Sequence, residues 1–200
     1  MFARLSFATT VALACFACNN ATPPFNEADA LDKGNRIADA SFQAFSERLQ
    51  GAMLTGGPVH AVQFCSVNAL PIIDSLSEAH HARIRRTSDR IRARHDVPDA
   101  EEMEVLNEFL SAWEFSDGTM GSAPVVRVHE DSIAFYRPIF ISSPACLKCH
   151  GSAGEDLDSA AYAVIAQRYP LDQATGYALG DLRHVEHPLE ALIVLAGITL

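Results

Sequence analysis

The sequence predicts one α+β domain in which helices flank a small antiparallel sheet. Apolar residues recur at helical spacing through residues 27–77, and β-branched and aromatic residues fill residues 125–140. The 200 residues are 48% hydrophobic and 20% charged, a composition that supports a real core and is too apolar for a disordered chain.

Two helices are predicted at the start of this domain, packed as an antiparallel pair. The first spans Glu27 to Met53, where apolar side chains recur at spacings of three, four or seven. The "TGGP" stretch of residues 55–58 ends this helix and starts a second, because proline is tolerated in a first helical turn. The second helix runs to about Ser77, and one of its faces carries Cys65, Ala69, Ile72 and Leu76.

An arginine-rich segment follows, which we expect to be a long loop with some local order. Six of the 15 basic residues of the chain lie between Arg83 and Arg94. A third helix is predicted to begin at Pro98, because acidic residues in its first turn suit the helix dipole, and to end near Trp113.

The second half of the chain predicts strands around two short helical stretches. Residues 125–131 and 132–140 read as the two strands of a β-hairpin. A short helix is expected over residues 158–169, and a turn into a last strand over residues 176–187. Residues 189–200 read as a strand or a core-packing tail, because a bilayer span needs roughly 20 apolar residues.

Charge narrows the classes of partner. With 15 Lys+Arg against 25 Asp+Glu, the formal net charge is -10, which disfavours binding to nucleic acid or to an anionic lipid surface.

The N-terminus is typical of an exported protein. Residues 1–17 combine one Arg, a short apolar run and small residues, as in a signal peptide of the lipoprotein type. Cys18, directly before "NN", is the predicted lipidation site; Cys15 is the alternative, and cleavage without a lipid is a third outcome. We therefore expect a linker over residues 18–30, a single domain over residues 31–200, and a location in the periplasm or cell envelope with membrane contact only through the lipid.

The sharpest chemical signal is "CLKCH", residues 146–150. C-x-x-C-H is the attachment signature of c-type haem: Cys146 and Cys149 would form thioethers to the two porphyrin vinyl groups, and His150 would reach the iron from below the ring. One such motif predicts one covalent haem c. The alternatives are a zinc site, which would want a second ligand pair, a thioredoxin-like redox pair, and a structural disulfide closing a very small loop.

The second axial position of the iron stays open from the residues alone. The candidates are water, a gas or another side chain, among them Cys65, several histidines and three methionines: Met53, Met103 and Met120. Cys65 is equally explained as a small buried residue on an apolar helix face.

From Asp32 to about His187 the chain resembles a family of small single-haem c-type proteins with a PAS-like sensor fold, some of which are input domains of bacterial histidine kinases. The resemblance rests on five segments in order: "AVQFCSVNA", "RIRRTSDRIRARHDVPD", "FYRPI", "CLKCHG" and "RYPLDQATGYALGDLR". It implies a PAS-like antiparallel sheet and an unusual axial pair, which falls here on His150 and Cys65.

The resemblance also bears on the arginine-rich segment. Arg85, Arg86 and Arg90 lie in the family's "RR-x-S" region and are candidate partners of the haem propionates, although they could equally face water or pair with acidic residues. The chain departs from the family at His184, where a glycine is usual after "GD-x-R", and in the loop before "PD".

The sequence thus predicts a non-enzymatic, haem-binding protein of the cell envelope that acts in electron transfer or in redox or ligand sensing, with an unidentified redox or signalling protein as partner. The alternative is a zinc- or disulfide-stabilised extracytoplasmic binding module without haem.

Overall fold

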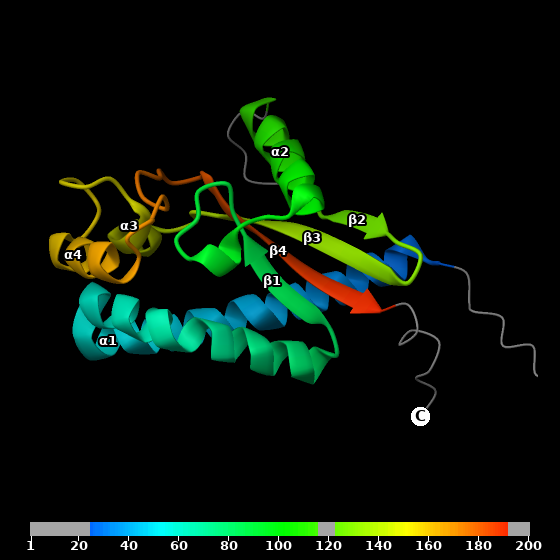
Figure 1. Cartoon of the computed structure of the whole chain (residues 1–200), viewed down its shortest axis with the longest axis horizontal. Coiled ribbons are helices and arrows are strands. Elements are labelled where there is room, and N and C mark those ends of the chain that lie inside the picture. Colours follow the sequence, from blue (N-terminus) through cyan, green and yellow to red (C-terminus); the bar gives the residue numbers. More distant parts are fainter. Residues whose placement is uncertain (1–24, 116–122, 192–200) are drawn as a thin grey trace, which may run out of the picture.

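The computed structural model describes residues 25–115 and 123–191 (Figure 1). The predicted signal peptide, Cys15 and Cys18 lie outside these residues, as does most of the predicted C-terminal tail. One four-stranded antiparallel sheet forms the centre, with helix α1 (Glu27–His80) along one face and α2 (Ala100–Phe115) on the other. Helices α3 (Pro144–His150) and α4 (Ser159–Arg168) lie beyond one end of the sheet, on the left in Figure 1. The predicted α+β class is confirmed.

Helix α1 is the predicted antiparallel helix pair. Its backbone leaves helical geometry at Gly56 and Gly57, where the chain reverses, and the two arms run side by side beneath the sheet (Figure 1). Gly57 has a φ of 66° and a ψ of -163°, a combination that is almost confined to glycine. Asn26 caps the first arm by accepting a hydrogen bond from the Ala28 amide, so the last four residues of the predicted linker are already helical. The second arm extends to His80, three residues beyond the expected end.

The expectation of a loop after α1 was wrong for its first part, because strand β1 (Arg83–Thr87) occupies it. This strand pairs antiparallel with β4 (Leu182–Ala191), with Arg86 opposite Glu186. Ile84 and Thr87 are buried while the arginines between them form ion pairs with buried carboxylates. The strand is therefore stabilised by partners far away in the sequence, and its own residues lack the apolar alternation that would have predicted it.

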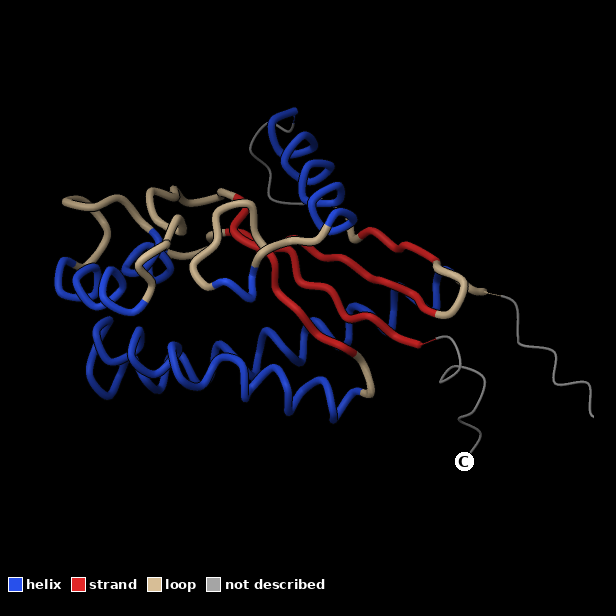
Figure 2. The backbone as a smooth tube through the Cα atoms, viewed as in Figure 1, coloured by secondary structure: helices blue, strands red, loops and turns tan. Residues whose placement is uncertain are grey.

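The other strands match the prediction. Strands β2 (Val125–Val128) and β3 (Ser132–Phe140) form the expected hairpin, and the last strand, β4, lies between β1 and β3, giving the order β1-β4-β3-β2. The single sheet layer is seen in red in Figure 2.

Apolar contacts join both faces of the sheet to helices. Helix α2 begins at Ala100, two residues after the predicted start, because the Asp99 and Glu102 side chains accept hydrogen bonds from each other's amides. A cluster on this side of the sheet joins α2 to β3 and β4; its buried members are Val105, Leu106, Phe109, Ala134, Tyr136, Leu182 and Val185. On the opposite face, Ile37 packs with Ala82 and Ile84 and so joins α1 to β1.

Two loops meet α3 at one end of the sheet (Figure 2). The loop after β1 is tied to the loop before β4 by a hydrogen bond of 2.8 Å from the Gln173 amide to the Ile91 carbonyl. The loop before β4 is tied to the end of α3 by the Gly176 amide, 2.9 Å from the Gly151 carbonyl. No helix among the described residues is both long enough and apolar enough to cross a bilayer.

Candidate functional site

The predicted attachment motif forms one short helix directly after β3. Ser143 is the N-cap residue of α3, and Pro144 occupies the first turn, where its missing amide hydrogen costs nothing. Cys146 and Cys149 are three positions apart on this helix, so both thiols lie toward the same side. Both are free thiols and partly buried. The helix thus presents two thiols and, at its last residue, an imidazole.

The imidazole of His150 is held by a backbone carbonyl. Its Nδ1 lies 2.8 Å from the carbonyl oxygen of Ala174, which can only accept, so Nδ1 carries the hydrogen and donates it. Nε2 then keeps its lone pair, which is the arrangement that metal-bound histidines adopt. Burial, followed by the charges of Arg183 and Arg92, holds the pKa of His150 well below its usual range. The side chain is therefore a neutral imidazole at pH 7.

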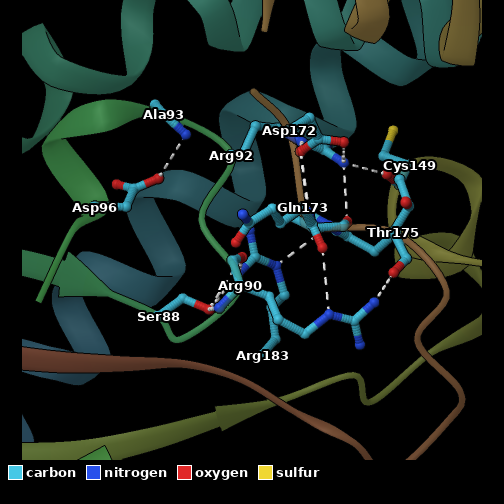
Figure 3. Close-up of polar contacts among 12 residues, drawn as sticks. Ser88, Arg90, Arg92, Ala93, Asp96, Cys149, Asp172, Gln173, Thr175 and Arg183 are labelled. Carbon is cyan, nitrogen blue, oxygen red and sulfur yellow. Dashed lines mark hydrogen bonds and ion pairs between the residues drawn. The ribbon is translucent and has the colours of Figure 1, made fainter. Parts of the chain in front are cut away.

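Arg92 organises the loop that carries this carbonyl (Figure 3). Its Nη2 donates to the Ala174 carbonyl at 3.0 Å and to the Cys149 carbonyl at 2.7 Å, and its Nε donates to Asp172 Oδ1 at 2.9 Å. One guanidinium therefore joins the end of α3 to residues 172–174.

Arg183, from β4, places a second positive charge beside the histidine. Its side chain is buried, donating to Ser88 Oγ at 3.0 Å and to the Arg90 carbonyl at 3.3 Å (Figure 3). Its Nε lies 3.2 Å from His150 Nδ1, and because Nδ1 donates to Ala174, this contact joins two donors. Burial lowers the pKa of Arg183 to about 10, so the group remains charged at neutral pH.

Cys65 lies on the second arm of α1, close to the motif. Val62, one turn earlier, packs in an apolar cluster that includes Cys149 and Tyr169. Burial, followed by the negative charge of an ionised Cys149, raises the pKa of the Cys65 thiol to about 11, against the opposing charges of Arg92 and Arg86. The fold therefore brings Cys65 within electrostatic reach of the motif, across 84 positions of sequence from Cys149.

The three arginines that the sequence singled out do not form one cluster. Arg85 points to the α2 side, where its Nε lies 3.2 Å from the Glu102 carboxylate. Arg86 points to the α1 side, with Nη2 3.5 Å from Glu186 and the guanidinium 4.3 Å from the ring centre of Phe45.

Arg90 lies in the loop after β1, 4.1 Å above the ring of Tyr177, and donates to the Gln173 carbonyl at 3.2 Å and to the Thr175 carbonyl. Arg85 Nε and the Nε and Nη2 of Arg86 are buried without a hydrogen-bond partner, although each guanidinium is ion-paired with a carboxylate, Glu102 or Glu186. Of these two arginines only Arg86 also acts on the Cys65 thiol, whose pKa its charge lowers.

Sequence reasoning missed Arg92 and Arg183 as parts of the site. Arg92 acts mainly on the backbone carbonyls of Cys149 and Ala174, which leave no trace in the order of side chains. Arg183 contacts Ser88, the Arg90 carbonyl and His150, which are far from it in the sequence. The available signals were the crowding of arginines before residue 95 and the lone arginine in "GDLR".

The donor set fits a covalently attached iron porphyrin better than a bare metal ion. Two free thiols on one side of a helix suit thioether formation, and His150 offers a free nitrogen lone pair. Across the part of the chain that the structure describes, no three His, Cys, Asp or Glu side chains converge in a way that could hold a metal ion.

Comparison with known proteins agrees with the fold. Over 82% of this chain and 95% of the other, the structure is similar to the crystal structure of the cyanobacterial heme-protein Tll0287, with a TM-score of 0.55 and 19% sequence identity. A search of curated proteins finds no match. The model of the Tll0287-like family matches residues 15–185, which include the motif, Cys65, Arg92 and Arg183. The chain therefore belongs to the Tll0287-like family.

Proposed function

We propose that this protein carries one haem, bound covalently through Cys146 and Cys149 with His150 as an axial ligand, and that it acts in electron transfer or redox sensing at the cell envelope. The observation that carries the proposal is the hydrogen bond from His150 Nδ1 to the Ala174 carbonyl at 2.8 Å, beside two free thiols. This bond fixes the ring orientation and leaves Nε2 available. The similarity to a heme-protein supports the same cofactor.

Cys65 is the proposed second axial ligand. It lies within electrostatic reach of Cys149 on a different helix, so the fold brings it close to the proposed attachment site. When bound, the iron porphyrin supplies one-electron redox chemistry, and a thiolate ligand favours the ferric state because negative charge stabilises the higher oxidation state. Of the three predicted propionate partners, Arg86 is the best supported, since its charge acts on the Cys65 thiol and its buried Nε makes no hydrogen bond, while its Nη2 lies 3.5 Å from Glu186.

Electron transfer and sensing make different demands on Cys65. An electron carrier keeps both axial ligands in the two oxidation states, whereas a sensor needs a ligand that leaves the iron and an element that responds. A partner protein is required in either role, and its identity is a matter for experiment.

The test is to export the protein in a host with working cytochrome assembly and to compare the wild type with Cys65→Ala. We expect a pyridine haemochrome spectrum of c-type haem in both proteins. The Soret and near-infrared bands of Cys65→Ala should lie at wavelengths different from those of the wild type. Bands that do not move would make Cys65 a structural thiol, while carbon monoxide binding to the reduced wild type would favour sensing over simple electron transfer.

We further propose that the mature protein is anchored through a lipid on Cys18. A metabolically incorporated fatty-acid analogue should label the wild type and Cys15→Ser but not Cys18→Ser. Labelling that is lost only in Cys15→Ser would move the anchor to that residue.

A further inference from the structure

We propose that Arg92, anchored by Asp172, is the positioning residue for the axial histidine: it holds the Ala174 carbonyl on His150 Nδ1 and so sets the orientation of the ring. The inference rests on the proposed function, since it concerns the ligand field that His150 would give to haem iron. Arg92 itself touches neither the imidazole nor the thiols through the contacts described above, and acts through the backbone.

The contacts converge on one residue of an irregular loop. The Ala174 carbonyl accepts from both His150 Nδ1, at 2.8 Å, and Arg92 Nη2, at 3.0 Å, which uses both lone pairs of the oxygen. The Ala174 amide donates to Asp172 Oδ1 at 3.2 Å, and the same oxygen accepts from Arg92 Nε at 2.9 Å. Ala174 is thus fixed at both its amide and its carbonyl by one ion pair.

The same guanidinium fixes the other end of the histidine. Arg92 Nη2 donates to the Cys149 carbonyl at 2.7 Å, one residue before His150. The planar guanidinium of Arg92 therefore holds both the backbone next to His150 and the carbonyl that accepts the hydrogen of its imidazole. A lysine could supply the charge but not this forked geometry.

Burial makes the pair sensitive to the loss of either member. The side chains of Arg92 and Asp172 are only 13% and 8% exposed. Each charge is stabilised by the other and by the surrounding hydrogen bonds, and removing one partner leaves the other buried and unpaired. The 172–177 loop, which has no helix or strand of its own, would then lose its main restraint at Ala174.

A purely structural role for the pair predicts a different outcome from a positioning role. If the pair only holds two loops together, its loss lowers the free energy of unfolding and leaves the ligand field of the haem iron unchanged. If it positions His150, the ligand field of the ferric iron changes as well, because the imidazole plane is no longer fixed.

The experiment compares ferric holoproteins by electron paramagnetic resonance, using Arg92→Lys, Asp172→Asn and the control Arg94→Lys. Arg94 lies two residues from Arg92, and its exposed side chain makes no hydrogen bond or ion pair with the described residues. We expect one low-spin signal in the wild type and in Arg94→Lys, and shifted or multiple low-spin signals in Arg92→Lys and Asp172→Asn. Wild-type signals in both test variants would overturn the positioning role.

Asp172→Asn keeps the question answerable if Arg92→Lys fails to fold, since the amide preserves the shape of the partner. A colourless wild-type protein would instead count against the proposed function as a whole. A coloured wild type with insensitive variants would count against the Arg92 inference alone.

Discussion

Replacing Ile165 with alanine would test how firmly the motif helix is packed against α1 and α4. Ile165 is fully buried on α4, in the cluster that also contains Val62 from α1 and the partly buried Cys149 from α3. This cluster joins the helix of the proposed attachment site to the helix arm that carries Cys65. A cavity in this cluster should therefore weaken the packing of both the α3 helix and the α1 arm.

The magnitude follows from the burial. An Ile→Ala change at a fully buried site removes apolar contacts and leaves a cavity, which costs about 2–5 kcal/mol of unfolding free energy. At the middle of that range, about 3.5 kcal/mol, the thermal unfolding midpoint of a domain of this size should fall by roughly 7–14 °C. Ile165→Val removes one methylene and should cost about 1 kcal/mol.

The assay is equilibrium urea unfolding of the exported protein, followed by circular dichroism. Val164→Ala is the comparison, because Val164 is the neighbouring residue on the same helix and packs against the same cluster while only partly buried, so its loss should cost less. A loss below about 1 kcal/mol for Ile165→Ala, or a loss equal to that of Val164→Ala, would refute the packing argument.

Three further outcomes are expected. In a variant whose two motif cysteines are serine, alkylation of Cys65 should become steadily faster up to pH 9.5 without a plateau, because burial, the larger cause, still raises the pKa of that thiol once the Cys149 charge is gone; a plateau near pH 8.5 would contradict it. Arg183→Met should lower the midpoint potential of the haem by roughly tens of millivolts, because the buried guanidinium 3.2 Å from His150 is a positive charge that favours the reduced iron; a potentiometric titration showing no shift would exclude an electrostatic role. Gly57→Ala should cost about 1–3 kcal/mol in urea unfolding because of the positive φ, whereas Gly51→Ala, in regular helix and equally free of close neighbours, should cost nothing.

Local patterns predicted the elements whose own residues specify them. The α1 hairpin follows from apolar spacing and from the glycines at residues 56–57, and the β2–β3 hairpin follows from its β-branched and aromatic residues. Strand β1 escaped prediction because its stability depends on β4 and on carboxylates at Glu102 and Glu186, none of which are close in sequence.

The site residues also divide into those that local sequence spacing predicts and those that it does not. Cys146, Cys149 and His150 are contiguous enough for their spacing alone to indicate the chemistry. Cys65 could be linked to them only through a family resemblance, since its position on an apolar helix face is equally suited to a core thiol.

The residues that surround His150 had only weak signals in the sequence, namely the crowded arginines before residue 95 and the arginine in "GDLR". The roles of Arg92 and Arg183 depend on two loops meeting at the end of the sheet, and on a carbonyl, that of Ala174, that any residue type could provide.

Intact-mass spectrometry of the exported protein tests the central claim most directly. The wild type, purified from a host that matures c-type cytochromes, should carry the added mass of one haem that survives denaturation, and a variant with serine at both Cys146 and Cys149 should not. A denatured wild-type chain without that added mass would contradict the account.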